Sequence, residues 1–167
     1  MEDIHDPHNV SAILRSADGV GIPEVQLLYI NEKFPKLGKK SSASAVKWVK
    51  RRAFTSIKEC YDRLHEEGFV ICATHLGKKS KSLHELDFTR NIALVFGNEH
   101  RGVSTEAAKL ADENFQIPMV GMIQSLNVSV ACAVSLYEAF RQRQVTNAVK
   151  YLPTAEIEQL FHEWMKK

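Results

Sequence analysis

A segment near the carboxyl end has residue types suited to chemistry. From Ile117 to Arg143 the sequence reads IPMVGMIQSLNVSVACAVSLYEAFRQR, so that Ser125 and Asn127 stand just before a long apolar stretch. The apolar residues recur with the period of a widely buried helix, and Ser125 is its predicted N-cap. The first N–H groups of a helix lack partners and can hold a carboxylate, a phosphate or a nucleotide edge. A bare structural cap is the alternative, because Val128 stands where a capping box has Glu or Gln.

A second group of polar residues lies near the start of the sequence, in DPHNVSAILRSADGVGI. The apolar residues of this segment trace one helical face, which predicts a helix from Asn9 to Asp18 with Asn9 as its N-cap. Gly19 and Gly21 are predicted to end it. Arg15 lies beside the apolar stripe and not opposite it, so it is a candidate site residue. A solvated arginine is the alternative.

The third segment, NIALVFGNEHRGVSTEAAKLAD, combines a strand, a loop and a helix. Its apolar run predicts a strand over Ile92–Phe96, and a helix follows over Ser104–Ala111. Gly97 and Gly102 are spaced like the outer glycines of a phosphate-binding P-loop, but Val103 stands where that loop needs lysine. An NTPase loop is therefore excluded. The spacing of a dinucleotide-binding fingerprint is also missing from the sequence.

The rest of the chain alternates between strand and helix patterns. The further predicted elements are strand Val25–Ile30, a short helix around Ser42–Lys50, helix Ser56–Glu67, strand Phe69–Thr74, strand Phe115–Ile117 and a helix from Thr154. Such alternation predicts an α/β fold with a parallel sheet and helices on both faces. Tyr151–Pro153 is the plausible hinge, so we expect a domain over residues 1–150 and a helical tail over 151–167 that docks on the domain or on a partner.

Composition limits the class of protein. A chain of 167 residues with 44% hydrophobic and 25% charged residues is one globular domain. Cys60, Cys72 and Cys132 are odd in number and form no CxxC pair, which is typical of reduced core thiols in a cytoplasmic protein. No apolar run approaches the ~20 residues of a membrane span, and the first residues are acidic where a signal peptide is basic. His5 and His8 lack further ligands at zinc spacing, so we expect no metal.

Positive charge is clustered, although the net charge is only +2. One cluster comprises Lys33, Lys36, Lys39, Lys40, Lys47, Lys50, Arg51 and Arg52, and a second comprises Lys78, Lys79 and Lys81. Either cluster could follow a phosphate backbone or be a solvated face. Arg141 and Arg143 end the long predicted helix, where cations also complement the helix dipole.

Together, the three segments resemble the SpoU/TrmH family of the SPOUT superfamily, whose members methylate ribose 2′-hydroxyl groups in tRNA and rRNA. The resemblance covers Asp3 to Arg143 and rests on three motifs in the family's order. They are N-x-x-A-x-x-R from Asn9, GNEHRGVS from Gly97, and IPM followed by SLNVSVA from Ile117. Within the family, the first and third motifs are similar to the branch that methylates guanosine 18 of tRNA.

The resemblance implies a fold and a cofactor. Family members thread their C-terminal segment through a loop, so it implies a deep trefoil knot, which is very rare among proteins in general. It also implies S-adenosylmethionine, bound in a bent form by backbone groups of three loops where small residues allow close approach. The implied cofactor-binding residues are Thr74, His75, Leu76, Phe96, Gly97, Asn98, Ile117, Met119, Ser125, Leu126 and Asn127.

The implied reaction is attack of a ribose 2′-hydroxyl on the sulfonium methyl group, with Arg15 as the central catalytic residue. A guanidinium has a pKa above ~12 and is a poor base at neutral pH. Arg15 is therefore either a stabiliser of the developing alkoxide or a phosphate-coupled proton acceptor. The residues expected to orient Arg15, ribose and methyl donor are Asn9, Glu99, Ser125 and Asn127. Glu99 could be a general base, but is more simply a positioning group. The expected RNA-binding residues are His8, Lys50, Arg51, Arg52, Arg141 and Arg143.

We therefore expect an S-adenosylmethionine-dependent enzyme that methylates guanosine 18 in the D-loop of tRNA, with an rRNA ribose as the alternative target. A catalytically silent RNA-binding protein would be expected to lack Asn9 or Arg15, and both are present. The apolar width of the helix over residues 125–143 predicts a homodimer in which this helix and the first one form the interface. Related tRNA enzymes carry extensions ahead of the first motif. Either the sequence is a trimmed form, or RNA binding relies on the core and the dimer mate.

Overall fold

A computed structural model of the protein describes residues 1–37, 45–148 and 153–166. Its elements in chain order are α1 (Pro7–Gly19), β1 (Glu24–Leu28), α2 (Ala45–Trp48), β2 (Lys50–Phe54), α3 (Ile57–Glu66), β3 (Val70–Thr74), β4 (Lys81–Ser82), the 3₁₀ helix η1 (Leu83–Glu85), β5 (Ile92–Val95), α4 (Thr105–Leu110), β6 (Glu113–Gln116), α5 (Val128–Val145) and α6 (Thr154–Trp164). Every pairing between these strands is parallel. The predicted α/β class with a parallel sheet is confirmed.

The strands form two hydrogen-bonded groups, β1-β2 and β4-β6-β3-β5. The first residues of the chain connect these groups: the backbone N–H of Glu2 donates to the carbonyl of Phe96, and that of Asp3 donates to the carbonyl of Leu28, both at 2.9 Å. Within the larger group, β3 lies between β5 and β6. Because parallel strands end at the same edge of a sheet, the loops that follow β3, β5 and β6 meet at one edge.

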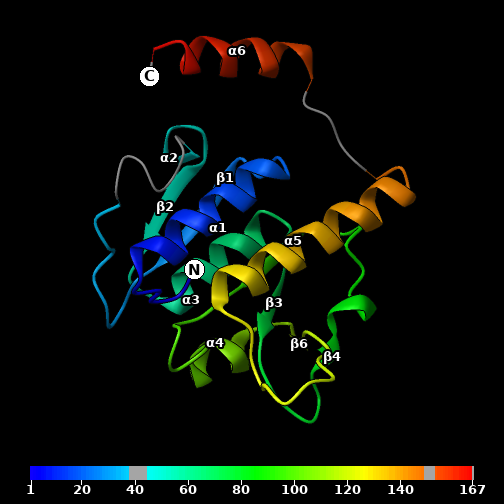
Figure 1. Ribbon diagram of the computed structural model, residues 1–167. Helices are drawn as coiled ribbons and strands as arrows, with labels where there is room; N and C mark the ends of the chain where they lie inside the picture. The colour runs from blue at the N-terminus through cyan, green and yellow to red at the C-terminus, as the bar shows by residue number, and fades with distance from the viewer. Residues whose placement is uncertain (38–44, 149–152, 167) are drawn as a thin grey trace.

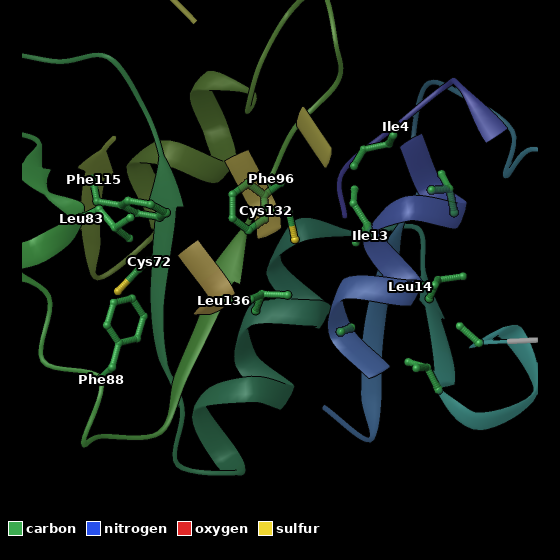
Figure 2. Packing of buried hydrophobic residues seen from close by; sticks show 14 of the residues in the cluster. Ile4, Ile13, Leu14, Cys72, Leu83, Phe88, Phe96, Phe115, Cys132 and Leu136 are labelled. Atoms are coloured by element: carbon green, nitrogen blue, oxygen red, sulfur yellow. The ribbon is translucent and has the colours of Figure 1, made fainter. Parts of the chain in front are cut away.

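Helices cover both faces of the sheet, as predicted. Cys72 of β3 belongs to a core cluster with Cys132 and Leu136 of α5 and the buried face of α1, shown in Figure 2. The residues before and after it, Ile71 and Ala73, belong to a second cluster with α3 and α4. The alternation along β3 follows from the two-residue period of a strand, which sends successive side chains to opposite faces.

The first helix begins earlier than its pattern predicts. Asp6 is the N-cap, and its carboxylate accepts a hydrogen bond from the backbone N–H of His8 at 2.8 Å. Pro7 follows at the start of the helix, where its fixed φ suits the helix and its missing N–H costs nothing. The prediction of Asn9 as N-cap is therefore wrong, and Asn9 lies in the first turn with its side chain available for other contacts.

The N-cap of α5 also differs from the prediction. Asn127 holds that position, and its Oδ1 accepts from the backbone N–H groups of Ser129 at 2.9 Å and Val130 at 3.4 Å. Ser125 is exposed and lies two residues before the cap. Asn and Ser are nearly equal as caps, so sequence preference alone does not distinguish the two positions.

Strand β2 was not predicted. The sequence predicts a short helix ending at Lys50, whereas the structure ends helix α2 at Trp48 and starts β2 at Lys50. Arg51 and Arg52 are two charged residues within the strand, which hides the apolar alternation that normally reveals one. The short β4 and η1 were also missed. Residues 42–44 of the predicted helix lie outside the described residues, as do Lys39 and Lys40.

The tail forms a helix, as predicted. Figure 1 shows α6 apart from α5, on the side of α2 and β2. The rings of Trp164 and Trp48 are edge to face at 5.4 Å, and Glu163 lies 3.9 Å from the Lys50 ammonium. The predicted hinge falls mostly at residues 151 and 152, which are outside the described part of the chain. In the described ranges, no helix combines the length and apolarity needed to cross a membrane.

A cavity of about 550 Å³ lies between β1 and β5, and Cys60 and Cys132 are among its lining residues. All three cysteines are buried and free. Burial raises the pKa of Cys60 to about 11 and that of Cys132 to about 12. These thiols therefore remain protonated at neutral pH and behave as core residues, which confirms their predicted place in the core.

Candidate active site

Three side chains from the three sequence motifs form one hydrogen-bonded group. Asn9 of α1, 8% exposed, donates from Nδ2 to Glu99 Oε1 at 2.9 Å. Asn127, at the start of α5, donates from Nδ2 to Asn9 Oδ1 at 3.0 Å. The first contact joins positions 90 apart in the chain and the second joins positions 118 apart. The fold thus assembles in space the residues that the sequence keeps far apart.

Glu99 holds the segment that leads into α1. Its two carboxylate oxygens accept from the backbone N–H groups of His5 and Asp6, each at 3.0 Å, in addition to Asn9. Burial alone would raise the pKa of Glu99, but the hydrogen bonds from Asn9, His5 and Asp6 outweigh it and hold the pKa below its usual value. The carboxylate is therefore ionised at neutral pH and already bonded to three donors. Such a group is suited to positioning and poorly suited to proton abstraction.

A tight turn presents Glu99. A Cβ added to Gly97 would lie 2.2 Å from backbone atoms of Gly102, so only glycine permits this approach. Gly102 has φ +68° and donates its N–H to the Asn98 carbonyl at 2.8 Å. Asn98 Oδ1 closes the turn by accepting from the N–H groups of His100 at 3.0 Å and Arg101 at 3.2 Å. Hydrogen bonds within the turn therefore fix its conformation.

Asn127 both caps a helix and completes the polar group. Its Oδ1 accepts from Ser129 N–H and Oγ, while its Nδ2 donates to Asn9. The carbonyl oxygen and the amide nitrogen of one side chain are thus both used. Ser125, predicted to share this role, is exposed and is placed by the fold in the loop ahead of the helix.

Arg15 stands apart from the group. It is exposed on α1, six positions after Asn9 and thus about 9 Å further along the helix axis. Its side chain makes no hydrogen bond or ion pair with the described residues. His8, seven positions before Arg15, is also exposed on the same face of α1. The fold of one chain presents both side chains outward and does not bring Arg15 to Glu99.

The predicted cofactor residues gather at the sheet edge where β3, β5 and β6 end. Thr74 Oγ1 donates to the carbonyl of Val95 at 3.1 Å, and the N–H of His75 donates to the carbonyl of Phe115 at 2.9 Å. These bonds hold the first loop between the other two. The predicted residues that lie in the three loops or beside them are Thr74, His75, Leu76, Phe96, Gly97, Asn98, Ile117, Met119, Ser125, Leu126 and Asn127.

The third loop presents apolar side chains to solvent. Val120 and Met122 are fully exposed, at 107% and 100%, and Ile123 is 64% exposed. Leu76 of the first loop is also largely exposed. Exposed apolar side chains of this kind can cover the apolar part of a ligand. Of the predicted cofactor residues, only Phe96 lines the cavity between β1 and β5, so that cavity is a separate feature.

Comparison with known proteins identifies the family of this chain. The sequence profile described as the SpoU rRNA Methylase family matches residues 1–137. This chain belongs to the SpoU methylase family. The tRNA (guanosine(18)-2′-O)-methyltransferase of Escherichia coli K12 is 42% identical over 169 residues, which cover 98% of this chain and 72% of that protein. The enzyme of the same description from Thermus thermophilus is 46% identical over 143 residues, covering 86% and 73%.

Solved structures of the SpoU family share the fold. The Aquifex aeolicus TrmH/SpoU tRNA modifying enzyme has a TM-score of 0.89 at 36% identity, covering 98% of this chain and 84% of that one. The SpoU methyltransferase AviRb of Streptomyces viridochromogenes, solved in complex with the cofactor AdoMet, has a TM-score of 0.76 at 28% identity, covering 87% and 62%. AdoMet is S-adenosylmethionine, and its use by SpoU family enzymes is therefore established.

Two of the predicted RNA-binding arginines are engaged within the SpoU fold. Arg141 makes a two-pronged contact with Glu138 at 2.8 Å, and this bond holds the pKa of Glu138 at about 2. Arg143 donates from Nε to the carbonyl of Phe88 at 2.8 Å and from Nη2 to that of Arg90 at 3.0 Å. Arg143 thus anchors α5 to the segment before β5, whereas the bond of Arg141 stays within α5. Contact of either arginine with RNA remains a prediction.

The basic residues of β2 differ among themselves. Arg52 pairs with Glu24 and Glu67, each at 2.7 Å, so much of its charge is balanced inside the chain. Lys50 is about half exposed, and its ammonium lies 3.9 Å from the carboxylate of Glu163 in the tail. Arg51 is exposed and aligned with Val25 of β1. Of the three, Arg51 is the most available to a phosphate.

Sequence reasoning missed the backbone part of the site. The N–H groups of His5 and Asp6, which bind Glu99, come from residues to which no positioning role was given. The Asp-Pro pair at Asp6 and Pro7 is a helix-start signal that locates this segment correctly. Among the described residues, no cluster of three or more His, Cys, Asp and Glu could hold a metal ion.

Proposed function

We propose that this chain transfers the methyl group of S-adenosylmethionine to the 2′-hydroxyl of guanosine 18 in tRNA. The observation that carries the proposal is the bonded group of Asn9, Glu99 and Asn127, because it joins the three sequence motifs of the family at one edge of the sheet. The relatives at 42% and 46% identity, which bear that activity in their names, support the choice of RNA. The cytoplasm is the proposed compartment, in keeping with the tRNA-modifying activity of these relatives.

The loops at this edge suit the proposed cofactor. The backbone of the loops after β3, β5 and β6 would hold it, and Leu76 and Met122 would cover its apolar part. When bound, it supplies an electrophilic methyl group. The same part of the chain is the proposed site of the trefoil knot, formed by passage of the segment that leads into α5. The proposed division into a domain over residues 1–150 and a tail over 151–167 keeps every loop of this site in the domain.

The residues of the chain would orient the reacting groups. Glu99 fixes Asn9, and Asn9 together with Asn127 would form the polar surface against which the ribose is oriented. Arg15 would act on the 2′-oxygen, either by stabilising the alkoxide or through a phosphate that takes the proton. Alignment of this kind matters because an error near 1 Å costs on the order of a hundredfold in rate.

The exposure of Arg15 favours a site shared between two subunits. Val130, Val134 and Tyr137 are exposed and recur along one side of α5, which packs beside α1. An apolar stripe next to an unpaired catalytic arginine fits a twofold interface, in which each subunit presents Arg15 toward the other. Sedimentation equilibrium at low micromolar concentration tests this proposal: a monomer that still methylates RNA would refute both the dimer and the shared site.

The decisive experiment is transfer of a tritiated methyl group to unmodified tRNA and to rRNA fragments, followed by mapping of the methylated nucleotide. Methylation of tRNA at guanosine 18 is the expected result. Transfer to rRNA alone would show that the substrate is rRNA and not tRNA. Absence of transfer to both RNAs, together with retained RNA binding, would indicate a silent RNA-binding protein.

The role of Arg15 is tested separately. Arg15→Ala should abolish methyl transfer and leave the calorimetric affinity for S-adenosylmethionine, measured with excess chelator, nearly unchanged. Arg15→Lys should not restore activity, because an ammonium lacks the planar fork of donors. A rate above about a tenth of wild type, a deficit below ~1.4 kcal/mol, would remove Arg15 from the chemical step.

A further inference from the structure

Asp3 is a buried carboxylate to which the site described above assigns no role. It is 4% exposed and has φ +49°, a left-handed conformation that residues with a Cβ rarely adopt. Its Oδ1 accepts from the backbone N–H groups of Ile30 at 2.8 Å and Glu32 at 3.2 Å. Asn31 adds its own N–H at 3.2 Å and its Nδ2 at 2.9 Å. The carboxylate therefore ties the left-handed residue to the loop after β1.

The backbone of Asp3 faces the opposite way, toward the turn that carries Glu99. The Asp3 carbonyl accepts from Asn98 Nδ2 at 2.8 Å, and Asn98 Oδ1 in turn closes the turn around Glu99. Two and three residues further along the chain, the N–H groups of His5 and Asp6 bind the Glu99 carboxylate. Asp3 thus stands between two sets of contacts that together fix Glu99.

The charge on Asp3 is stable at working pH. Burial would raise its pKa, but the hydrogen bonds from Ile30, Asn31 and Glu32 outweigh burial and lower it. Arg101, from the turn that carries Glu99, lies 3.9 Å from Asp3 Oδ2 and 3.2 Å from Glu32. The ion pairs of Arg101 therefore also join the loop after β1 to the turn that carries Glu99.

We infer that Asp3 is a positioning residue for the methyl-transfer site, acting through Asn98 and Glu99 on Asn9. Without the charged carboxylate, the bonds to Ile30, Asn31 and Glu32 that hold the left-handed backbone of Asp3 are weakened or lost, and its conformation then rests on its own N–H and carbonyl contacts. Its relaxation turns the carbonyl away from Asn98 and shifts the N–H groups that Glu99 binds. The role in catalysis rests on the proposed function, whereas the coupling of Asp3 to Glu99 does not.

The test compares Asp3→Asn with Asp112→Asn. Asp112 is a matched control, because its carboxylate also accepts a backbone N–H, from Ile71 at 2.7 Å, and also has a lowered pKa, but it binds His65 at the other end of the sheet. Asp3→Asn should lower kcat by roughly ten- to a hundredfold, the cost of a misplaced group. The KM for RNA and the Kd for S-adenosylmethionine should stay within about threefold of wild type. Asp112→Asn should keep kcat and lose only thermal stability.

A second readout does not depend on methylation. Amide hydrogen exchange at His5, Asp6 and Gly102 should be faster in Asp3→Asn than in Asp112→Asn, because these N–H groups bind Glu99 or close its turn. If wild type transfers no methyl group, the proposed function fails and exchange alone decides the role of Asp3. Unchanged exchange at these amides overturns the inference, as does a folded Asp3→Asn with wild-type kcat in an active enzyme.

A milder variant covers the case in which Asp3→Asn does not fold. Asn31→Ala removes one side-chain donor to Asp3 and leaves the three backbone donors in place. It should lower kcat by about threefold, corresponding to a weakened single contact, and accelerate exchange at His5 and Asp6. Wild-type kcat and exchange in a folded Asn31→Ala would overturn the inference.

Discussion

Two loops at the same sheet edge differ sharply in how they are held. The turn over residues 97–102 follows β5 and is closed by Asn98, by the contact of two glycines and by the bonds of Glu99. The loop over residues 118–126 follows β6 and exposes Val120, Met122 and Ile123 to solvent. One half of the candidate site is thus preformed by the chain, and the other half lacks a covering partner within the described residues.

This difference separates two tasks of a transferase. Groups that orient reacting atoms are most effective when they are fixed before the substrate binds, as in the turn around Glu99. Groups that enclose a cofactor must let it enter and leave, which suits an apolar loop like the one at Met122. We expect substitutions in the turn to affect folding and catalysis together, and substitutions in the loop to affect binding alone.

Gly97→Ala should have the largest effect. The added Cβ would lie 2.2 Å from backbone atoms of Gly102, which have no flexible end that can move away. We expect a loss of about 3 kcal/mol in the free energy of unfolding, a drop in Tm of roughly 6–12 °C for a chain of this size, and loss of methyl transfer. Gly121→Ala is the control in the open loop, where an added Cβ meets nothing within 4 Å. Equal Tm values for the two variants would abolish the distinction between the loops.

Glu99→Gln should have the next largest effect. The amide keeps one acceptor oxygen but places an NH₂ group against donors, so one of the bonds to His5, Asp6 and Asn9 is lost. We expect a loss of about 2 kcal/mol in the free energy of unfolding at pH 7 and roughly thirtyfold slower methyl transfer. Denaturant unfolding and steady-state kinetics measure these quantities.

The same variant predicts a pH dependence. The folded-state pKa of Glu99 is lowered from 4.5, so its ionised form stabilises the fold fully above the unfolded pKa. The advantage of wild type over Glu99→Gln should therefore shrink as the pH falls below 4.5 and through the lowered folded-state pKa. A constant difference in unfolding free energy between pH 7 and pH 3 would contradict the assignment of charge to Glu99.

Asn127→Ala tests the contact that joins the end of the loop after β6 to Asn9, and through Asn9 to the turn around Glu99. The change removes the cap of α5 and the bond to Asn9, so we expect about 1–2 kcal/mol less stability, weaker S-adenosylmethionine binding and slower turnover. Ser125→Ala, two residues earlier, should change the unfolding free energy by less than about 0.5 kcal/mol. A larger loss for Ser125→Ala would restore Ser125 as the cap. Undiminished binding and activity in Asn127→Ala would remove the third motif from the site.

Met122→Ser should have the smallest effect on the isolated chain. Because the side chain is fully exposed, the unfolding free energy should change by less than about 0.5 kcal/mol. The calorimetric affinity for S-adenosylmethionine should fall, since an apolar cover is lost. A Tm loss comparable to that of Asn127→Ala would show that the loop packs on its own chain, and the comparison between the two loops would fail.

The helices and most strands could be predicted because their apolar periods are regular. Strand β2 could not, because Arg51 and Arg52 interrupt the alternation, and tertiary pairing with β1 decides its conformation. The motifs located the site, but not the bonds within it. Nothing in the spacing indicates that Asn127 and not Ser125 caps α5, or that Arg143 binds the carbonyl of Phe88, since both depend on how distant segments pack.

The distance along the chain between Asn9 and Asn127, 118 residues, has a consequence for the order of folding. Bringing two positions together costs more entropy as the intervening chain lengthens, so contacts of long separation form after local helices and neighbouring strands. The polar group is completed only when α5 docks beside α1. A nascent or partly folded chain therefore contains ordered helices and strands while its polar group is still incomplete, and methyl transfer needs this long-range contact to form first.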